Sequence, residues 1–101
     1  AAQDLLGWVA LQPRDAYGWE LLGQALNLQG DTLRSIRSQA ESLALKFDYV
    51  AAIDRLMAAQ ELARQLARNG RLDRGQEMEA AIIDSRLRTL QLARREQALQ
   101  R

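Results

Sequence analysis

The chain of 101 residues contains no cysteine and no histidine, and it has a single proline. Without cysteine it can form neither a disulfide framework nor a cysteine-ligated zinc site. Without histidine it lacks the commonest general base and the commonest metal ligand. We therefore expect no catalytic residue, no metal site and no cofactor in this chain, and an enzyme is the least favoured class of function.

Aromatic residues are also scarce, at 5%, and no apolar run approaches the length of a membrane span. No signal peptide is visible. Alanine, leucine, glutamine and arginine are abundant instead, and this mixture favours helix throughout. Because the chain begins Ala-Ala and not Met, we expect it to be a mature or excised piece of a longer protein.

The formal charge of +1 is unevenly distributed, since residues 1–50 carry 4 basic and 6 acidic groups (4 − 6 = −2) and residues 51–101 carry 10 and 7 (10 − 7 = +3). The arginines of the second half alternate with acidic residues, as on a solvated helix face. No basic stripe is interleaved with aromatic residues, so we expect no nucleic-acid partner. The acidic pairs Glu77/Glu79 and Asp54/Glu61 are expected to be solvated rather than catalytic.

Apolar residues recur at helical spacing in five segments, which predicts an all-α fold of about five helices. The expected helices cover residues 1–12, 16–29, from 32 to about 46, 48–68, and from 72–76 almost to 101. Pro13, Gly30 and the Asn69-Gly70 pair mark the turns between them. Tight turns join antiparallel neighbours, so the helices should form hairpins. The polar residues after Leu92 are expected to fray.

The segment GWELLGQALNLQGD, residues 18–31, matches the start of the 34-residue tetratricopeptide repeat (TPR). With residue 16 at the first position, the marks of the repeat are Trp19, Leu22, Gly23, Ser35 and Ser42. Two helices approach closely only where small side chains meet at their crossing. We therefore expect Gly23 to face Ser35 and Ser42, so that these marks serve packing and not chemistry.

The same register extends over the whole chain, which is expected to form a single domain at residues 1–101. Residues 1–12 would be the second helix of a truncated repeat that ends at Pro13. Residues 16–46 would form a complete repeat, and residues 48–101 a degenerate, long C-terminal hairpin. Stacked hairpins of this kind form a short right-handed α-solenoid, because one hairpin cannot bury its apolar face alone.

Two segments resemble the C-terminal end of bacterial periplasmic zinc metalloproteases of the BepA type: residues 47–65, FDYVAAIDRLMAAQELARQ, and residues 78–91, MEAAIIDSRLRTLQ. In that family an HExxH catalytic domain is followed by TPR repeats. The resemblance covers the whole chain as TPR, and it departs from the family at residues 66–77, which look longer and more charged. It implies a periplasmic, non-catalytic module that recruits or positions protein substrates or partners.

First helices line the concave groove of a TPR solenoid. The groove residues expected from this register are Tyr17, Glu20, Gln24, Asn27, Leu28, Asp54 and Glu61. This face is polar to acidic, and Glu20 and Asp54 would repel the C-terminal carboxylate of a peptide. The expected partner is therefore a protein or peptide, but not one bound through its terminal carboxylate.

Two alternatives stay open at this point. The chain is either the interaction module of a periplasmic protease or a free-standing TPR scaffold or adaptor unrelated to proteolysis. The periplasmic location follows from the resemblance only, so a cytoplasmic location also stays open. Apolar residues that lack cover on residues 1–12 and on the last helix favour a homodimer, or a domain swap around Asn69-Gly70.

Overall fold

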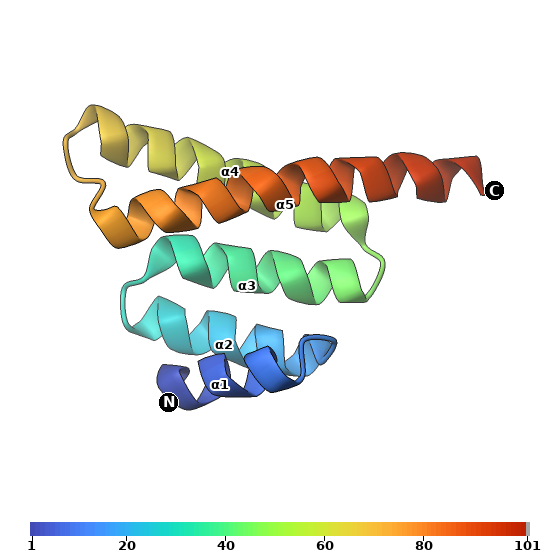
Figure 1. Ribbon diagram of the computed structural model, residues 1–101, viewed down its shortest axis with the longest axis horizontal. Helices are drawn as coiled ribbons and strands as arrows, with labels where there is room; N and C mark the ends of the chain where they lie inside the picture. The colour runs from blue at the N-terminus through green and yellow to red at the C-terminus, as the bar shows by residue number, and fades with distance from the viewer. Residues whose placement is uncertain (101) are drawn as a thin grey trace.

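The computed structural model describes residues 1–100, which form five α-helices and no strand. The helices are α1 (Ala2–Leu11), α2 (Ala16–Leu28), α3 (Thr32–Leu45), α4 (Tyr49–Arg68) and α5 (Arg74–Leu99). Consecutive helices run antiparallel and lie side by side (Figure 1). The molecule measures 44 × 31 × 17 Å, so it is less than two helix diameters thick. The prediction of an all-α fold of about five helices is confirmed.

Aspartate side chains begin three of the helices. The Asp31 carboxylate accepts the Arg34 backbone N–H at 3.3 Å, and the Asp48 carboxylate accepts that of Ala51 at 3.2 Å. Asp73 and Gln76 form a reciprocal capping box at the start of α5, with distances of 2.8 and 2.9 Å. Each cap satisfies a backbone donor that has no partner inside its helix. At the other end α5 stays helical to Leu99, close to the expected end of the last helix.

The three turns that follow α2, α3 and α4 share one backbone geometry. In each, the residue after the C-cap has a positive φ: Gly30 at 79°, Phe47 at 62° and Gly70 at 67°. The Phe47 N–H donates to the Ala44 carbonyl and the next N–H donates to the Leu43 carbonyl, which is the Schellman pattern of helix ends. Glycine adopts this conformation without strain, whereas a side chain makes it unfavourable. Phe47 is therefore the one strained residue among the three turns.

We expect Phe47→Gly to stabilise the protein by about 0.5–1 kcal/mol, because glycine removes the strain but loses more backbone entropy on folding. The matched control is Lys46→Gly, at the neighbouring C-cap with φ −90°, where glycine has no strain to relieve and should destabilise. Urea unfolding monitored by tryptophan fluorescence measures both changes. A lower midpoint for Phe47→Gly than for the wild type would contradict this account of the turn.

The interior has two apolar clusters. The larger joins α3, α4 and α5 through Leu33, Ala40, Ala52, Ile53, Leu56, Ala59, Ala63, Ile83, Leu87 and Leu90. The smaller joins α1 to α2 through Ala2, Val9, Leu22 and Leu26. Of the expected repeat marks, Leu22 therefore lies in the smaller cluster, and Trp19 packs at its edge. Between the two clusters, hydrogen bonds from Ser35 and Ser42 join α3 to α2.

Gly23 and Ser35 meet where α2 and α3 cross. The Ser35 hydroxyl donates to the Gly23 carbonyl at 2.7 Å. A Cβ atom on Gly23 would lie 3.1 Å from the Gln39 Cγ atom and 3.2 Å from the Ser35 carbonyl oxygen. The prediction that Gly23 also faces Ser42 is wrong, because the Ser42 hydroxyl donates to the Ala16 carbonyl, about two turns of α2 away, at 2.8 Å. Ser35 and Ser42 thus hold the two ends of one close helix pair.

Both tryptophans hold the turn between α1 and α2. The Trp8 Nε1–H donates to Asp15 at 2.7 Å, and the Trp19 Nε1–H donates to the Pro13 carbonyl at 2.9 Å. The hydrogen bond from Trp8 lowers the pKa of the Asp15 carboxyl, as do backbone donors of α2. Elsewhere on α1 the Leu11 side chain is 79% exposed. The expected homodimer stays a prediction. Within residues 1–100, no helix is long and apolar enough to cross a membrane.

Candidate binding surfaces

The structure separates the seven groove residues expected from the repeat register. Glu20 and Gln24 of α2 line a cavity of about 270 Å³, which we call the α2–α4 cleft. The others do not line this cleft: Tyr17, Asn27, Leu28, Asp54 and Glu61. All five are exposed on α2 or α4. Two of the seven residues are therefore brought together, at one wall of a cleft.

The floor of the α2–α4 cleft is a face of α3. It consists of Gln39, Ser42, Leu43 and Lys46, and α4 adds Arg55 at the other wall. The α3 residues of the floor were not predicted from the sequence, because the repeat register assigns only the first helix of each repeat to the groove. The signal was present, since residues 39, 42, 43 and 46 recur at the spacing that places side chains on one face of a helix.

The charge of this cleft differs from the expected polar-to-acidic face. It contains one carboxylate, Glu20, and two cations, Lys46 and Arg55, so its formal charge is +1 (2 − 1). None of the three forms an ion pair within residues 1–100. The difference arises because Arg55, and not its neighbour Asp54, lines this cleft, and because Lys46 of α3 adds a second cation. A carboxylate of a bound peptide would thus find two positive partners here.

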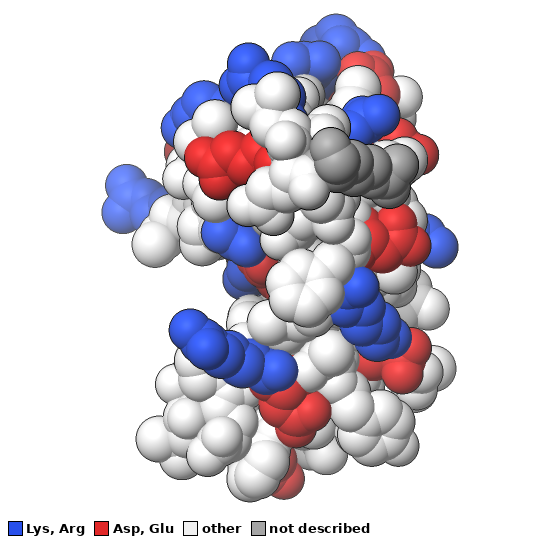
Figure 2. Space-filling model, turned by 90° about the vertical axis from the view of Figure 1, so that its right-hand side faces the viewer, with Lys and Arg blue, Asp and Glu red and all other residues white. Residues whose placement is uncertain are grey.

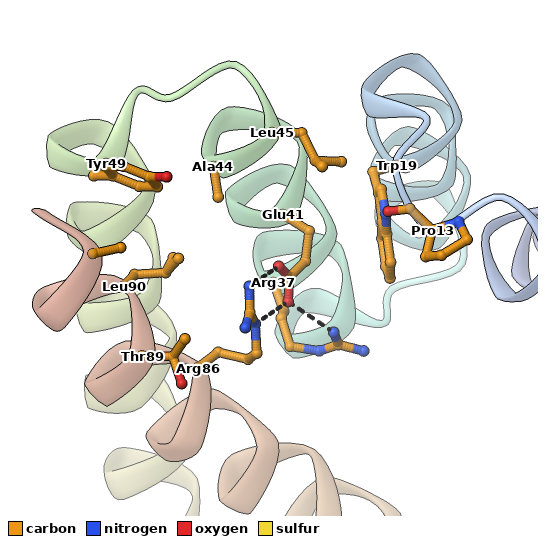
Figure 3. A pocket seen from close by; sticks show the side chains of 11 residues that line it. Pro13, Trp19, Arg37, Glu41, Ala44, Leu45, Tyr49, Arg86, Thr89 and Leu90 are labelled. Carbon is orange, nitrogen blue, oxygen red and sulfur yellow. Dashed lines mark hydrogen bonds and ion pairs between the residues drawn. The ribbon is translucent and has the colours of Figure 1, made fainter. Parts of the chain in front are cut away.

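A larger cavity of about 460 Å³, the α2–α5 cleft, is lined by another set of α3 residues: Arg37, Glu41, Ala44 and Leu45 (Figure 3). Pro13 and Trp19 form one wall, Thr89 and Ala93 of α5 form the other, and Tyr49, the first residue of α4, also lines the cavity. Figure 2 views the molecule from the side of the α1–α2 and α3–α4 turns. In this view the surface is hollowed between the upper part, formed by α4 and α5, and the lower part, formed by α1 and α2.

An ion-pair network covers the floor of the α2–α5 cleft. Arg86 of α5 donates two hydrogen bonds to the Glu41 carboxylate of α3, from Nε and Nη2, each 2.8 Å long. Arg37, one turn before Glu41, donates to it at 3.3 Å and also donates to Glu79 of α5. The Arg37 guanidinium lies 5.7 Å from the centroid of the Trp19 ring, within cation–π range. The network therefore ties α2, α3 and α5 together.

The two carboxylates of this network are buried. Glu41 is 8% exposed and Glu79 is 5% exposed, so the expectation that Glu79 belongs to a solvated helix face is wrong. Burial raises the pKa of the Glu79 carboxyl, and the positive charge of Arg37 opposes that shift. With two arginines against two glutamates the network is neutral, so it serves as a structural tie and offers no net charge to a ligand.

No group of three or more acidic side chains within residues 1–100 is arranged as a set of metal ligands. In Figure 2 the positive surface is gathered over α4 and α5, in agreement with the charge difference between the halves of the sequence.

Comparisons with protein-family models, with curated proteins and with solved structures found no match to this chain. The resemblance described above therefore rests on the sequence motifs alone.

Proposed function

We propose that this chain is a non-catalytic protein-interaction module that binds an extended segment of a partner protein in the α2–α4 cleft. The observation that carries the proposal is the composition of that cleft. Two side-chain amides, from Gln24 and Gln39, stand beside charged groups that have no ion-pair partner within residues 1–100. Amides of this kind can donate to and accept from an extended backbone.

The bound segment should carry an acidic side chain near Lys46 and Arg55. Opposite charges steer association and select among partners, even where they add little affinity in exposed positions. Glu20 on the facing wall favours a positive or donor group at the other edge of the same segment. The cleft therefore fits a peptide with both signs of charge better than a uniformly acidic one.

We further propose that the helices are stacked as TPR-like hairpins in a short right-handed solenoid. Antiparallel neighbours, tight turns and the close crossing of α2 and α3 at Gly23 and Ser35 support this arrangement. On this view residues 16–46 are the complete repeat, and residues 48–101 are the degenerate C-terminal hairpin. The α2–α4 cleft would then lie between the first helices of two successive repeats.

The test of binding begins with a random-peptide library, from which segments that bind the whole chain are selected. Binding of a selected peptide is then measured by calorimetry for the wild type and for Lys46→Gln and Arg55→Gln. We expect each substitution to lower affinity about three- to tenfold, because a complementary charge is lost at the contact. Arg64→Gln, also exposed on α4 but outside this cleft, is the control and should bind as the wild type does.

The wider setting of the module is also a proposal. The resemblance of residues 47–65 and 78–91 supports the proposal that this chain is the C-terminal TPR region of a periplasmic BepA-type metalloprotease. There the module would recruit or position substrates. A free-standing TPR adaptor is the alternative. The gene sequence upstream of this segment separates the two: an HExxH motif in a preceding domain is expected, and an upstream domain without one would rule out the protease.

A further inference from the structure

Phe47 combines an unfavourable backbone conformation with an exposed aromatic side chain. It occupies a position with φ 62°, where the two equivalent turns use Gly30 and Gly70. A bulky residue in this region is a genuine outlier, and such strain is retained chiefly where it serves function. Phe47 is also 69% exposed, so burial of its side chain does not compensate the strain.

Within residues 1–100, the Phe47 ring has one aromatic neighbour. It meets the Tyr49 ring edge to face, with centroids 6.4 Å apart and planes at 85°. The Gln97 side-chain amide donates to the Phe47 carbonyl at 3.3 Å, a bond that any residue at position 47 could accept. The aromatic ring itself is thus left free to contact something outside the chain.

The ring borders a cavity of about 200 Å³ between the α3–α4 turn and the last turns of α5, which we call the aromatic pocket. The pocket is lined by Phe47, Tyr49, Ala93, Glu96, Gln97 and Gln100. Among residues 1–100, its lining combines two aromatic rings, one carboxylate and two side-chain amides and includes no lysine or arginine. Glu96 forms no ion pair within residues 1–100.

We propose that the aromatic pocket binds a lysine or arginine side chain of a partner protein. Aromatic faces attract an ammonium or a guanidinium through the ring quadrupole. The Glu96 carboxylate supplies the opposite charge, and the amide oxygens of Gln97 and Gln100 can accept from the N–H groups of the cation. An apolar side chain would instead desolvate Glu96 without compensation. The pocket shares no lining residue with the α2–α4 cleft, so this site is separate from the proposed peptide site.

The probes are three capped tripeptides: acetyl-Gly-Arg-Gly-amide, acetyl-Gly-Lys-Gly-amide and the neutral acetyl-Gly-Gln-Gly-amide. The chain has a single phenylalanine, so its ring protons in a proton NMR spectrum belong to Phe47. We expect saturable shifts of the Phe47 and Tyr49 ring signals with the arginine peptide, the lysine peptide or both, and none with the glutamine peptide. The relative affinities decide which cation fits. Absence of a shift with either cationic peptide, or equal shifts with all three, would overturn the proposal.

Three variants distinguish recognition from folding. Glu96→Gln keeps the shape of the side chain and should lower affinity for the better cationic peptide about threefold or more while leaving thermal stability unchanged. Phe47→Gly should abolish the shift at Tyr49 although the protein becomes more stable, an outcome that damage to the fold cannot produce. Leu28→Ala, at an exposed leucine of α2, should bind as the wild type does. Wild-type binding by either Phe47→Gly or Glu96→Gln would show that the pocket is not the site.

Discussion

Gly23→Leu is expected to destabilise the protein by about 2–3 kcal/mol, at the upper end of what overpacking usually costs. The Cβ atom alone would approach the Ser35 carbonyl oxygen to 3.2 Å, and backbone atoms of a packed helix cannot move aside easily. The branched end of leucine would then force α2 and α3 apart and break the hydrogen bond between Ser35 and Gly23. The gain in helix propensity, about 0.8 kcal/mol over glycine, does not offset this loss.

Thermal unfolding followed by circular dichroism measures the effect, and a loss of this size should lower the melting temperature by about 10 °C or more. The same substitution at Gly7 of α1 is the matched control, because no atom lies within 4 Å of a Cβ built there. Gly7→Leu should leave stability unchanged or slightly raised. If Gly23→Leu melts together with Gly7→Leu, the close crossing of α2 and α3 is wrong.

Arg37→Met is expected to destabilise the protein by about 3 kcal/mol at pH 7, since removing one partner of a buried ion pair leaves the other uncompensated. Methionine retains an apolar stem of similar length, so the change isolates the charge. Glu79 would lose its positive neighbour while remaining buried among α3 and α5. Urea unfolding of both proteins gives the difference in free energy.

The pH dependence of this difference identifies Glu79 as its source. A carboxyl with a raised folded-state pKa favours folding most below its unfolded pKa, and that contribution is lost as pH rises through the folded value. Without Arg37, which opposes the raised pKa, the value should rise further. The deficit of Arg37→Met should therefore be largest at pH 7 and shrink as pH falls toward 5. Arg64→Met, in an exposed pair with Glu61, should show little deficit at either pH.

Local signals in the sequence predict the helices well. Helices begin at the aspartate caps at residues 31 and 48 and end at the glycine turns at residues 30 and 70. Such signals act over four or five residues, so the local sequence is enough to predict where these helices begin and end. The packing of Gly23 on Ser35 was also accessible, because the repeat spacing relates the two helices of a hairpin. These elements depend on neighbours that are close along the chain.

The sites were harder to predict because they depend on which face each helix turns toward distant neighbours. Glu79 looks solvated by its composition, yet α5 brings it to Arg37, 42 residues earlier. Arg55 and Asp54 are adjacent in sequence, and a rotation of about 100° about α4 decides which of them enters the α2–α4 cleft. The strain at Phe47 is visible only in the backbone of the α3–α4 turn, since no sequence pattern marks that residue as left-handed.

The central claim, that a partner segment lies in the α2–α4 cleft, is tested most directly by NMR titration of the ¹⁵N-labelled chain with a library-selected peptide. The predicted result is a set of shifted amide signals confined to residues 20–24 of α2, residues 39–46 of α3 and the surroundings of Arg55. Shifts that cluster on another surface, or a library that yields no binding peptide at all, would contradict it.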